Sequence, residues 1–378
     1  MKYIYICNMK DNLQLATTYV FESIQGRYVT AIHLDSFLDT LPAIFKISTV
    51  GFSVKQQPIK AIQFGEGAVK ILVWSQMHGN ESTTTKGLID YLNYLNYNEK
   101  EFEMLSKSFS FYILPILNPD GAAAYTRENA NGVDLNRDAF TCTQTESQVL
   151  KTVLKNFNPD YCFNLHDQRS IFGLVETQKP ATMSFLTASY NESRTFNPVR
   201  EKAAAVIAGI NVELQKHIPN QIGRFDDSFN INCTGDYFTN IGYPTILFEA
   251  GHYANDYNRD EVRKFVFIAL KAAISFINEN DIVSSNLGNY LNIYQNNKCF
   301  YDFIYKNVRI NDNNVEKIIK FAVQYKEVLT EGKIAFIPEI IQIENLDSFF
   351  AHQTIDFENK LYEFENRNFP KIGDIIKV

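Results

Sequence analysis

The chain has 378 residues, of which 45% are hydrophobic and 21% are charged. This composition excludes a fibrous or a disordered protein, and the length favours one large domain with a smaller unit attached. Acidic residues outnumber basic ones by 43 to 36, which gives a net charge of −7, so we expect no nucleic-acid partner.

Cysteine usage and apolar runs bear on where the protein is located. The cysteines are odd in number and widely scattered, which predicts free thiols; they are Cys7, Cys142, Cys162, Cys233 and Cys299. Polar residues from Asn8 onward interrupt the N-terminal segment too early for the core of a signal peptide. The apolar runs are also far shorter than the ~20 residues that a membrane span needs. We therefore expect a cytoplasmic protein with no membrane partner.

From Pro42 onward, short apolar runs alternate with longer helical patterns, which is typical of an α/β domain with a largely buried sheet. The expected strands are residues 68–77, 109–117, 161–165 and 245–248. The expected helices are residues 82–95, where Ser and Thr residues are capping candidates, 146–156, 200–217 and 259–278.

The pattern changes at the two ends of the chain. Residues 1–42 form a prelude that either covers a cleft or extends the sheet, and residues 43–285 form the main domain. Residues 286–378 are expected to form a small β-rich domain with short strands such as 333–337 and 339–343. His352, in that domain, is expected to be solvated or structural.

Three residues have the types and positions of zinc ligands. His78 and Glu81 lie three residues apart just after the first expected strand, and His166 ends another strand. Imidazole and carboxylate groups bind zinc, but a His-x-x-Glu pair alone often occurs by chance. His166 supplies a third ligand and leaves a fourth position open for water, as catalytic zinc sites require. We predict one zinc ion per chain at these three residues.

Four further residues are candidates for catalysis and substrate binding. Glu249 ends the strand 245–248 and is the best candidate for a general base, the alternative being a surface glutamate at a strand end. Arg127, Asn136 and Arg137 lie in a polar segment that is too rich in charge for a core element. Arginine can pair with a carboxylate or stabilise an oxyanion, although a surface ion-pair loop would have the same composition.

Five motifs occur in an order that strongly resembles the funnel-type zinc metallocarboxypeptidases, the family of carboxypeptidase A-like peptidases. They are HGNE at 78–81, NPDG at 118–121, GVDLNRD at 132–138, the strand-ending His166, and ILFEAG at 246–251. The resemblance covers roughly residues 49–277. It implies a mixed, mostly parallel central sheet flanked by helices, zinc on His78, Glu81 and His166, and Glu249 as base and proton shuttle.

The same resemblance implies roles in substrate binding. Arg127 would polarise the scissile carbonyl, and Asn136 and Arg137 would hold the terminal carboxylate of a peptide substrate. Members of the family usually carry a mobile tyrosine upstream of the catalytic glutamate, but residues 224–233 contain none. Tyr237 or Tyr243 could take its place.

Two other segments are expected near the metal. Residues 234–236 are expected near the substrate side chain, and residues 167–169 are expected either to support the metal ligands or to contact substrate.

The resemblance predicts a metallocarboxypeptidase that acts on peptides with a free C-terminal carboxylate. One alternative is a zinc-dependent deacylase acting on an N-acyl amino acid or a murein-type peptide, since that activity uses a similar zinc site. An inactive peptide-binding module is a third reading, but it would normally have lost a ligand or the base. The complete set of motifs favours the peptidase.

Overall fold

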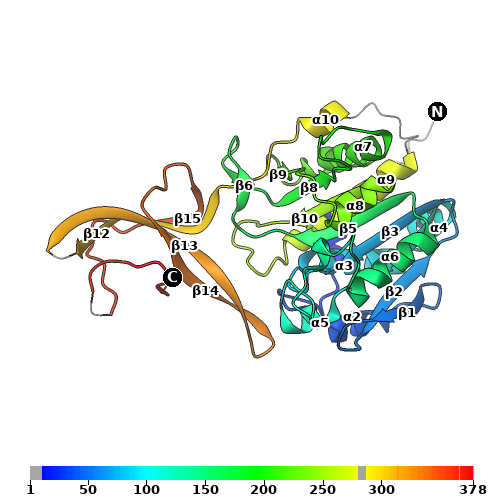
Figure 1. Cartoon of the computed structure of the whole chain (residues 1–378), viewed down its shortest axis with the longest axis horizontal. Coiled ribbons are helices and arrows are strands. Elements are labelled where there is room, and N and C mark those ends of the chain that lie inside the picture. Colours follow the sequence, from blue (N-terminus) through cyan, green and yellow to red (C-terminus); the bar gives the residue numbers. More distant parts are fainter. Residues whose placement is uncertain (1–10, 280–286, 313, 366, 378) are drawn as a thin grey trace, which may run out of the picture.

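The computed structural model describes residues 11–279, 287–312, 314–365 and 367–377. A large α/β unit is followed by a separate β-sheet near the C-terminus (Figure 1). Cys7 and the expected boundary between residues 285 and 286 lie outside the described residues.

The α/β unit is built on a sheet of eight strands in the order β1-β2-β4-β3-β5-β10-β8-β9. The strands are β1 (Lys46–Phe52), β2 (Pro58–Phe64), β3 (Val69–Ser75), β4 (Phe109–Leu114), β5 (Tyr161–Asp167), β8 (Met183–Thr187), β9 (Ile222–Arg224) and β10 (Thr245–Ala250). The four central strands β4, β3, β5 and β10 run parallel, whereas β1 pairs antiparallel with β2 and β8 antiparallel with β10. The expected mixed, mostly parallel sheet is confirmed.

Helices cover both faces of this sheet (Figure 1). They are α1 (Asn12–Thr18), α2 (Ala31–Leu38), α3 (Thr83–Tyr97), α4 (Glu99–Ser108), α5 (Pro119–Ala124), α6 (Thr145–Phe157), α7 (Pro198–Leu214), α8 (Thr234–Asn240), α9 (Val262–Glu279) and α10 (Leu287–Leu291), with a 3-10 turn at Leu135–Arg137. Alternate residues of β3 face opposite sides: Ile71 and Val73 join the core under α3, α7 and α9, and Leu72 and Trp74 join the core under α6. Both faces of the central strands are therefore buried.

The expected helices and strands of this unit all form, with ends that shift by a few residues. The prelude contributes α1 and α2, whose Ala16 and Phe37 are buried in the main core. In its described part, residues 11–42, it adds helices and no strand to the sheet. Helix α10 packs on α7 with Tyr290 fully buried. The packed unit therefore continues at least to α10.

The C-terminal sheet has the strand order β14-β13-β12-β15. Its strands are β12 (Phe300–Asp312), β13 (Val315–Thr330), β14 (Lys333–Ile343) and β15 (Phe350–Asp356). The prediction of short strands here was wrong, because residues 333–337 and 339–343 form one continuous strand. Pro338 lies between them, and β14 tolerates it because an edge strand can lack one backbone donor. A small sheet of β6 (Phe172–Leu174), β7 (Lys179–Pro180) and β11 (Asn297–Lys298) completes the strands.

Polar and aromatic contacts join the C-terminal sheet to the α/β unit. The His352 ring lies 3.9 Å from that of His252, centroid to centroid, and its Nε2 is 2.7 Å from the carbonyl oxygen of Ser170. Tyr257 donates its hydroxyl to Asp302 at 3.1 Å. Burial lowers the pKa of His352 to about 4, so the ring is neutral at physiological pH and serves a structural role.

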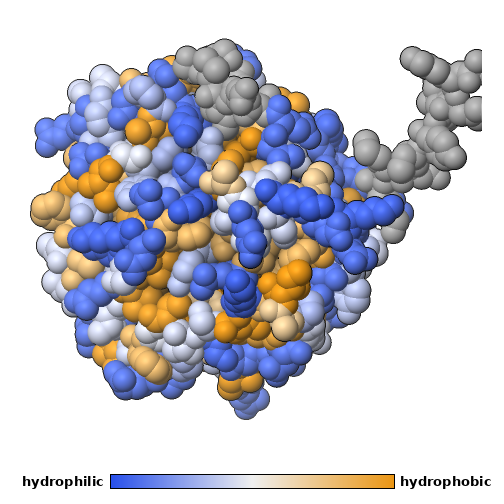
Figure 2. Space-filling model, turned by 90° about the vertical axis from the view of Figure 1, so that its right-hand side faces the viewer, coloured by the Kyte–Doolittle hydropathy of each residue, from blue (hydrophilic) through white to orange (hydrophobic). Residues whose placement is uncertain are grey.

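On the face turned away from the C-terminal sheet, polar and apolar residues are interspersed (Figure 2). Exposed apolar side chains interspersed among polar ones are normal on a protein surface. Among the helices in the described part of the chain, none is long and apolar enough to cross a membrane.

Candidate active site

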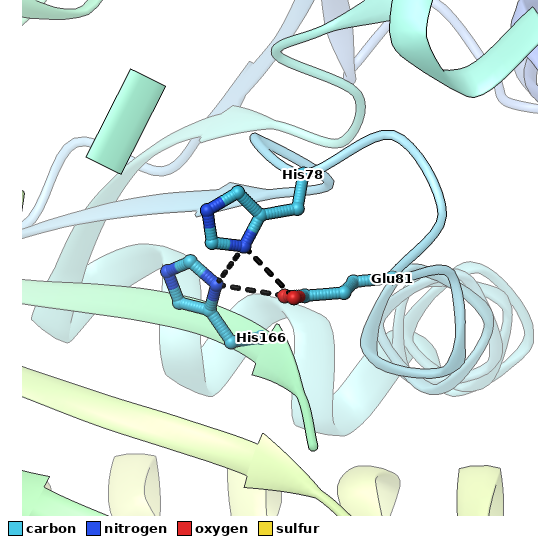
Figure 3. Close-up of side chains that lie close together, drawn as sticks. All are labelled: His78, Glu81 and His166. Carbon is cyan, nitrogen blue, oxygen red and sulfur yellow. Dashed lines mark hydrogen bonds and ion pairs between the residues drawn. The ribbon is translucent and has the colours of Figure 1, made fainter. Parts of the chain in front are cut away.

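His78, Glu81 and His166 converge at the C-terminal edge of the central strands (Figure 3). The Nδ1 atoms of His78 and His166 are 3.1 Å apart, and each lies 2.8 Å from one oxygen of the Glu81 carboxylate. Each residue offers one possible ligand atom, a ring nitrogen or a carboxylate oxygen, and the three atoms lie within 4.8 Å of one another. We call these three residues the metal centre.

Neighbouring strands and a helix start position the metal centre. His78 follows β3 in the loop to α3, Glu81 lies just before α3, and His166 is the penultimate residue of β5. The first turn of α3 is capped by Asp167 of β5, whose carboxylate accepts bonds from the backbone N–H groups of Thr83 at 2.7 Å and Thr84 at 3.0 Å. The local Ser and Thr capping expected from the sequence is thus replaced by an acid from another strand, which locks the Glu81 turn onto β5.

Asp134 orients the first ligand. Its carboxylate accepts a bond from Nε2 of His78 at 2.9 Å, so that nitrogen carries the hydrogen and Nδ1 faces the centre. Burial raises the pKa of Asp134, but the His78 bond and nearby positive charges outweigh it and hold this pKa far below its ordinary value. Burial lowers the pKa of His78, whereas the Glu81 charge and the two carboxylate contacts raise it on balance. This role of Asp134 was not predicted from the sequence, although Asp134 lies within the GVDLNRD motif.

The donor set fits zinc. With Nε2 of His78 bonded to Asp134, the ring presents a lone pair at Nδ1 when it is neutral, and an ionised Glu81 carboxylate can only accept. Two imidazole nitrogens and a carboxylate facing one point are the ligand types of catalytic zinc sites, which use three protein ligands. His78, Glu81 and His166 can therefore hold the ion.

Glu249 lies directly beside the metal centre. In the parallel pairing of β10 with β5 it is opposite His166, so both side chains leave the same face of the sheet. Within the described residues its carboxylate has no hydrogen-bond or ion-pair partner, and it lines the cavity over the metal centre. Burial, reinforced by the negative charges of Glu81 and Asp167, raises its pKa well above the ordinary value. A bound cation would act in the opposite direction.

A cavity of about 990 Å³ opens above these residues. It brings together all seven predicted site residues: His78, Glu81, Arg127, Asn136, Arg137, His166 and Glu249. Arg127 donates to Asp134 through Nε at 3.1 Å and contacts Glu81 through a terminal nitrogen at 3.1 Å. Its guanidinium is thereby fixed beside the metal centre while staying partly exposed to the cavity.

Asn136 and Arg137 lie in the 3-10 turn after Asp134. Asn136 accepts the backbone N–H of Thr234 at 2.8 Å, which fixes the turn against α8. The Arg137 side chain is exposed and contacts the Cys233 sulfur at 3.1 Å, and it has no carboxylate partner in the described structure. It is available to a ligand anion.

The two tyrosines considered for catalysis do not line this cavity. Tyr237 packs against Phe140 and Phe238, and the Tyr243 hydroxyl donates to Asn158 at 3.1 Å. Phe225 and Phe229 line the cavity instead, together with Gly235 and Asp236. Burial raises the pKa of Asp236 to about 6.

The three polar residues after His166 separate into different roles. Asp167 caps α3, and Gln168 bonds to Ala181 and Asn296 in the interior. Arg169 is exposed and has no side-chain partner within the described ranges. The sequence predicted that these residues either support the metal ligands or contact substrate. Asp167 supports the metal-binding turn, and the Arg169 side chain is free to contact a bound molecule.

Comparison with known proteins identifies the class. A profile of the zinc carboxypeptidase family matches residues 31–347, so the chain belongs to this family. Curated relatives include carboxypeptidase E of Caenorhabditis elegans, 33% identical over 142 residues, and carboxypeptidase SOL1 of Arabidopsis thaliana, 30% identical over 116 residues. The matched parts cover 30% and 28% of this chain, and 30% and 23% of those relatives. The chain thus spans less than a third of the curated relatives it matches.

Solved structures share the fold at low identity. A metallo-carboxypeptidase from Burkholderia cenocepacia superimposes with a TM-score of 0.54 at 16% identity, covering 66% of this chain and 70% of that one. One from Pseudomonas aeruginosa has a TM-score of 0.51 at 15% identity, with the same coverage. These similarities establish the fold of the α/β unit.

Proposed function

We propose that the chain is a metallocarboxypeptidase that hydrolyses the C-terminal peptide bond of a peptide. The observation that carries the proposal is the pairing of Glu249 with His166 across parallel strands, within a cavity that also contains Arg137. A carboxylate without a partner beside three metal ligands suits a general base. An exposed arginine in the same cavity suits the carboxylate at the end of a peptide.

In the proposed reaction His78, Glu81 and His166 hold zinc, which when bound lowers the pKa of a water molecule and polarises a carbonyl group. Glu249 accepts the proton of the attacking water and delivers it to the leaving amine. Arg127 donates to the carbonyl oxygen as negative charge develops there. Support for that role comes from its two fixed contacts, to Asp134 and Glu81.

Asn136 and Arg137 are proposed to bind the terminal carboxylate, which presents the adjacent peptide bond to Glu249. Asp236, in the wall of the same cavity, offers an acidic partner for a cationic side chain. The fold neighbour from Pseudomonas aeruginosa was solved in complex with (2-guanidinoethylmercapto)succinic acid. This compound carries a guanidino group and a succinic acid group. Peptides ending in Lys are therefore the first substrates to compare with peptides ending in Leu or Glu.

The proposal is tested by mass spectrometry of products. The zinc-loaded protein is incubated with free-acid peptides, murein-type peptides and N-acyl amino acids, next to Glu249→Gln and a matched surface variant, Glu103→Gln. Loss of C-terminal residues is expected with the wild type and Glu103→Gln only, with zinc content unchanged in all three. Turnover by Glu249→Gln near the wild-type rate would refute the assignment of the base.

The same experiment separates the two alternatives. Release of acyl groups without loss of C-terminal residues would identify a deacylase, which the zinc site alone does not distinguish from a peptidase. No turnover by a protein that retains zinc, together with binding of peptides, would identify a binding module. The presence of all three ligands and of Glu249 in one cavity argues against that last outcome.

Organisation and location complete the proposal. We propose a prelude at residues 1–42, a catalytic domain that begins at residue 43 and extends beyond the expected end at residue 285 to include α10, and a C-terminal β-domain after it. A peptide is the proposed partner, with neither nucleic acid nor membrane involved, and the proposed location is the cytoplasm. Cys142, Cys162, Cys233 and Cys299 are free thiols, which supports a reducing compartment.

A further inference from the structure

A second cavity, of about 320 Å³, lies beside the first and is walled in part by the C-terminal sheet. Tyr325, Lys326 and Glu327 of β13 form its outer wall. Arg27 of the prelude also lines it, as does Asn80 of the loop between β3 and α3, residues 76–82, which we call the metal loop. The remaining lining residues are shared with the first cavity: Glu81, Arg127, Asp167, Gln168 and Arg169. A ligand that extends from the metal centre past Arg127 would therefore enter the second cavity.

Glu327 ties β13 to the metal loop. Its carboxylate pairs with Arg27 at 3.0 Å and also accepts the hydroxyl of Tyr125. Arg27 is only 7% exposed, and its carbonyl oxygen accepts the Ser82 hydroxyl at 2.6 Å, one residue after Glu81. A mostly buried ion pair with additional hydrogen bonds has a defined geometry, so this part of β13 is held at a fixed position beside the metal centre.

The acidic residues of the second cavity all have partners. Glu81 contacts both metal-centre histidines, Asp167 caps α3, and Glu327 pairs with Arg27. In contrast, Arg169 and Lys326 are exposed, and across the described residues neither has a side-chain hydrogen-bond or ion-pair partner. The unsatisfied charge in this cavity is thus positive.

We propose that Arg169 and Lys326 form an anion subsite that binds a carboxylate in the substrate upstream of the scissile bond. This inference rests on the proposed function, which assigns the terminal carboxylate to Asn136 and Arg137. Neither of those residues lines the second cavity, whereas Arg127 lines both cavities. A peptide held at its end by Arg137 and at its scissile carbonyl by Arg127 directs its preceding residues toward Arg169 and β13. The ligand is an Asp or Glu side chain of the peptide.

The subsite is tested by binding of matched peptides to the Glu249→Gln protein loaded with zinc, measured by calorimetry. Each peptide carries a free C-terminus and a single Glu, or Gln in its place, at one of the positions before the scissile bond. At one position the Glu peptide is expected to bind about fivefold more tightly, which corresponds to ~1 kcal/mol. The ratio should fall when the salt concentration is raised, because exposed charges are screened.

Arg169→Gln and Lys326→Gln, each made in the Glu249→Gln background, should each bring the ratio between Glu and Gln peptides toward one. Lys333→Gln is the matched control, since Lys333 is an exposed lysine of the same sheet that lines neither cavity. It should leave the ratio at the value of its parent. Equal binding of Glu and Gln peptides at every position, or a preference that survives both substitutions, would overturn the subsite.

Turnover by the wild type distinguishes this failure from a failure of the proposed function. Loss of C-terminal residues without any Glu preference would refute the subsite and leave the carboxypeptidase intact. A Glu preference in binding that depends on Arg169 and Lys326, with no hydrolysis by the wild type, would support the subsite and refute the enzyme. Failure of every peptide to bind would refute both.

Discussion

Asp134→Asn tests whether the metal centre depends on a charged partner outside its ligands. The Asp134 carboxylate accepts from Nε2 of His78 at 2.9 Å, from Nε of Arg127 at 3.1 Å and from the backbone N–H of Asn136 at 2.8 Å. Asparagine has nearly the same shape but no charge, and only one of its two terminal atoms can accept. The substitution therefore removes charge and one acceptor while sparing the packing of the loop.

The size of the effect follows from these contacts. A hydrogen bond to a charged group is about twice as strong as a neutral one, and partners of metal-binding histidines typically contribute 10–100-fold to metal affinity. We expect the zinc dissociation constant to rise about tenfold, which is ~1.4 kcal/mol. Without the carboxylate, the hydrogen on Nε2 of His78 is also less firmly placed, so Nδ1 presents its lone pair less of the time.

Zinc affinity is measured by competition with a chromophoric chelator, and Asp138→Asn is the control from the same loop. Asp138 is 3% exposed and accepts from Thr141, Thr143 and Gln144, but it contacts none of the metal-centre residues. Its substitution should lower the melting temperature and leave the zinc dissociation constant unchanged. Wild-type zinc affinity in Asp134→Asn, or an equal loss in Asp138→Asn, would refute the reasoning.

Three further substitutions test other parts of the site. Arg137→Ala should raise KM for free-acid peptides about tenfold, because a hydrogen bond to a charged group contributes ~1.5–3 kcal/mol. Steady-state kinetics should then show a smaller preference for free-acid over amidated peptides, and an unchanged preference would contradict the role of Arg137. Burial raises the pKa of Asp236 from 3.8 to about 6, so its contribution to stability is complete below pH 4 and is lost as the pH rises through 6. In urea unfolding at pH 7, Asp236→Asn should therefore be more stable than the wild type by on the order of 2 kcal/mol, and at pH 4 it should have no advantage. If the variant and the wild type are equally stable at pH 7 as well as at pH 4, this reasoning is refuted. Gly79→Ala would bring a Cβ within 1.9 Å of the Gly121 carbonyl carbon, so zinc affinity and melting temperature should both fall. Gly288→Ala is the control and should change neither, because no atom of the described residues lies within 4 Å of the added Cβ.

Much of the α/β unit could be predicted because its signals are local. The central strands are buried on both faces and therefore appear as continuous apolar runs, and the helices between them show the 3.6-residue period. The strands of the C-terminal sheet were harder to predict from the sequence. Its strands β12 and β13 have 13 and 16 residues with mixed burial, so polar positions within them resemble breaks between shorter strands.

The predicted site residues were found in the sequence because they follow apolar strands or lie within compact motifs. His166 and Glu249 end neighbouring parallel strands, and such ends meet at one edge of a sheet. The contacts that hold the site residues in place were not found in the same way: the partner of His78 was not predicted, and for Asp167 support of the metal ligands was one of two expectations. Asp134 lies 56 residues from His78, and Asp167 caps a helix that begins 84 residues before it. A carboxylate in a polar segment has the same local pattern whether it faces solvent or a histidine.

The ligand types, the order of the central elements and the likeness to zinc metallocarboxypeptidases follow from the amino-acid sequence alone, because each depends on residue identity and short-range periodicity. In contrast, the position of Tyr237 and Tyr243 outside the cavity, and of β13 as a wall beside the metal centre, is seen only in the folded chain. Glu327 lies 300 residues from Arg27, and their ion pair depends on how the C-terminal sheet docks on the α/β unit. Contacts of that kind are set by the packing of whole elements, which a local pattern of residues does not encode.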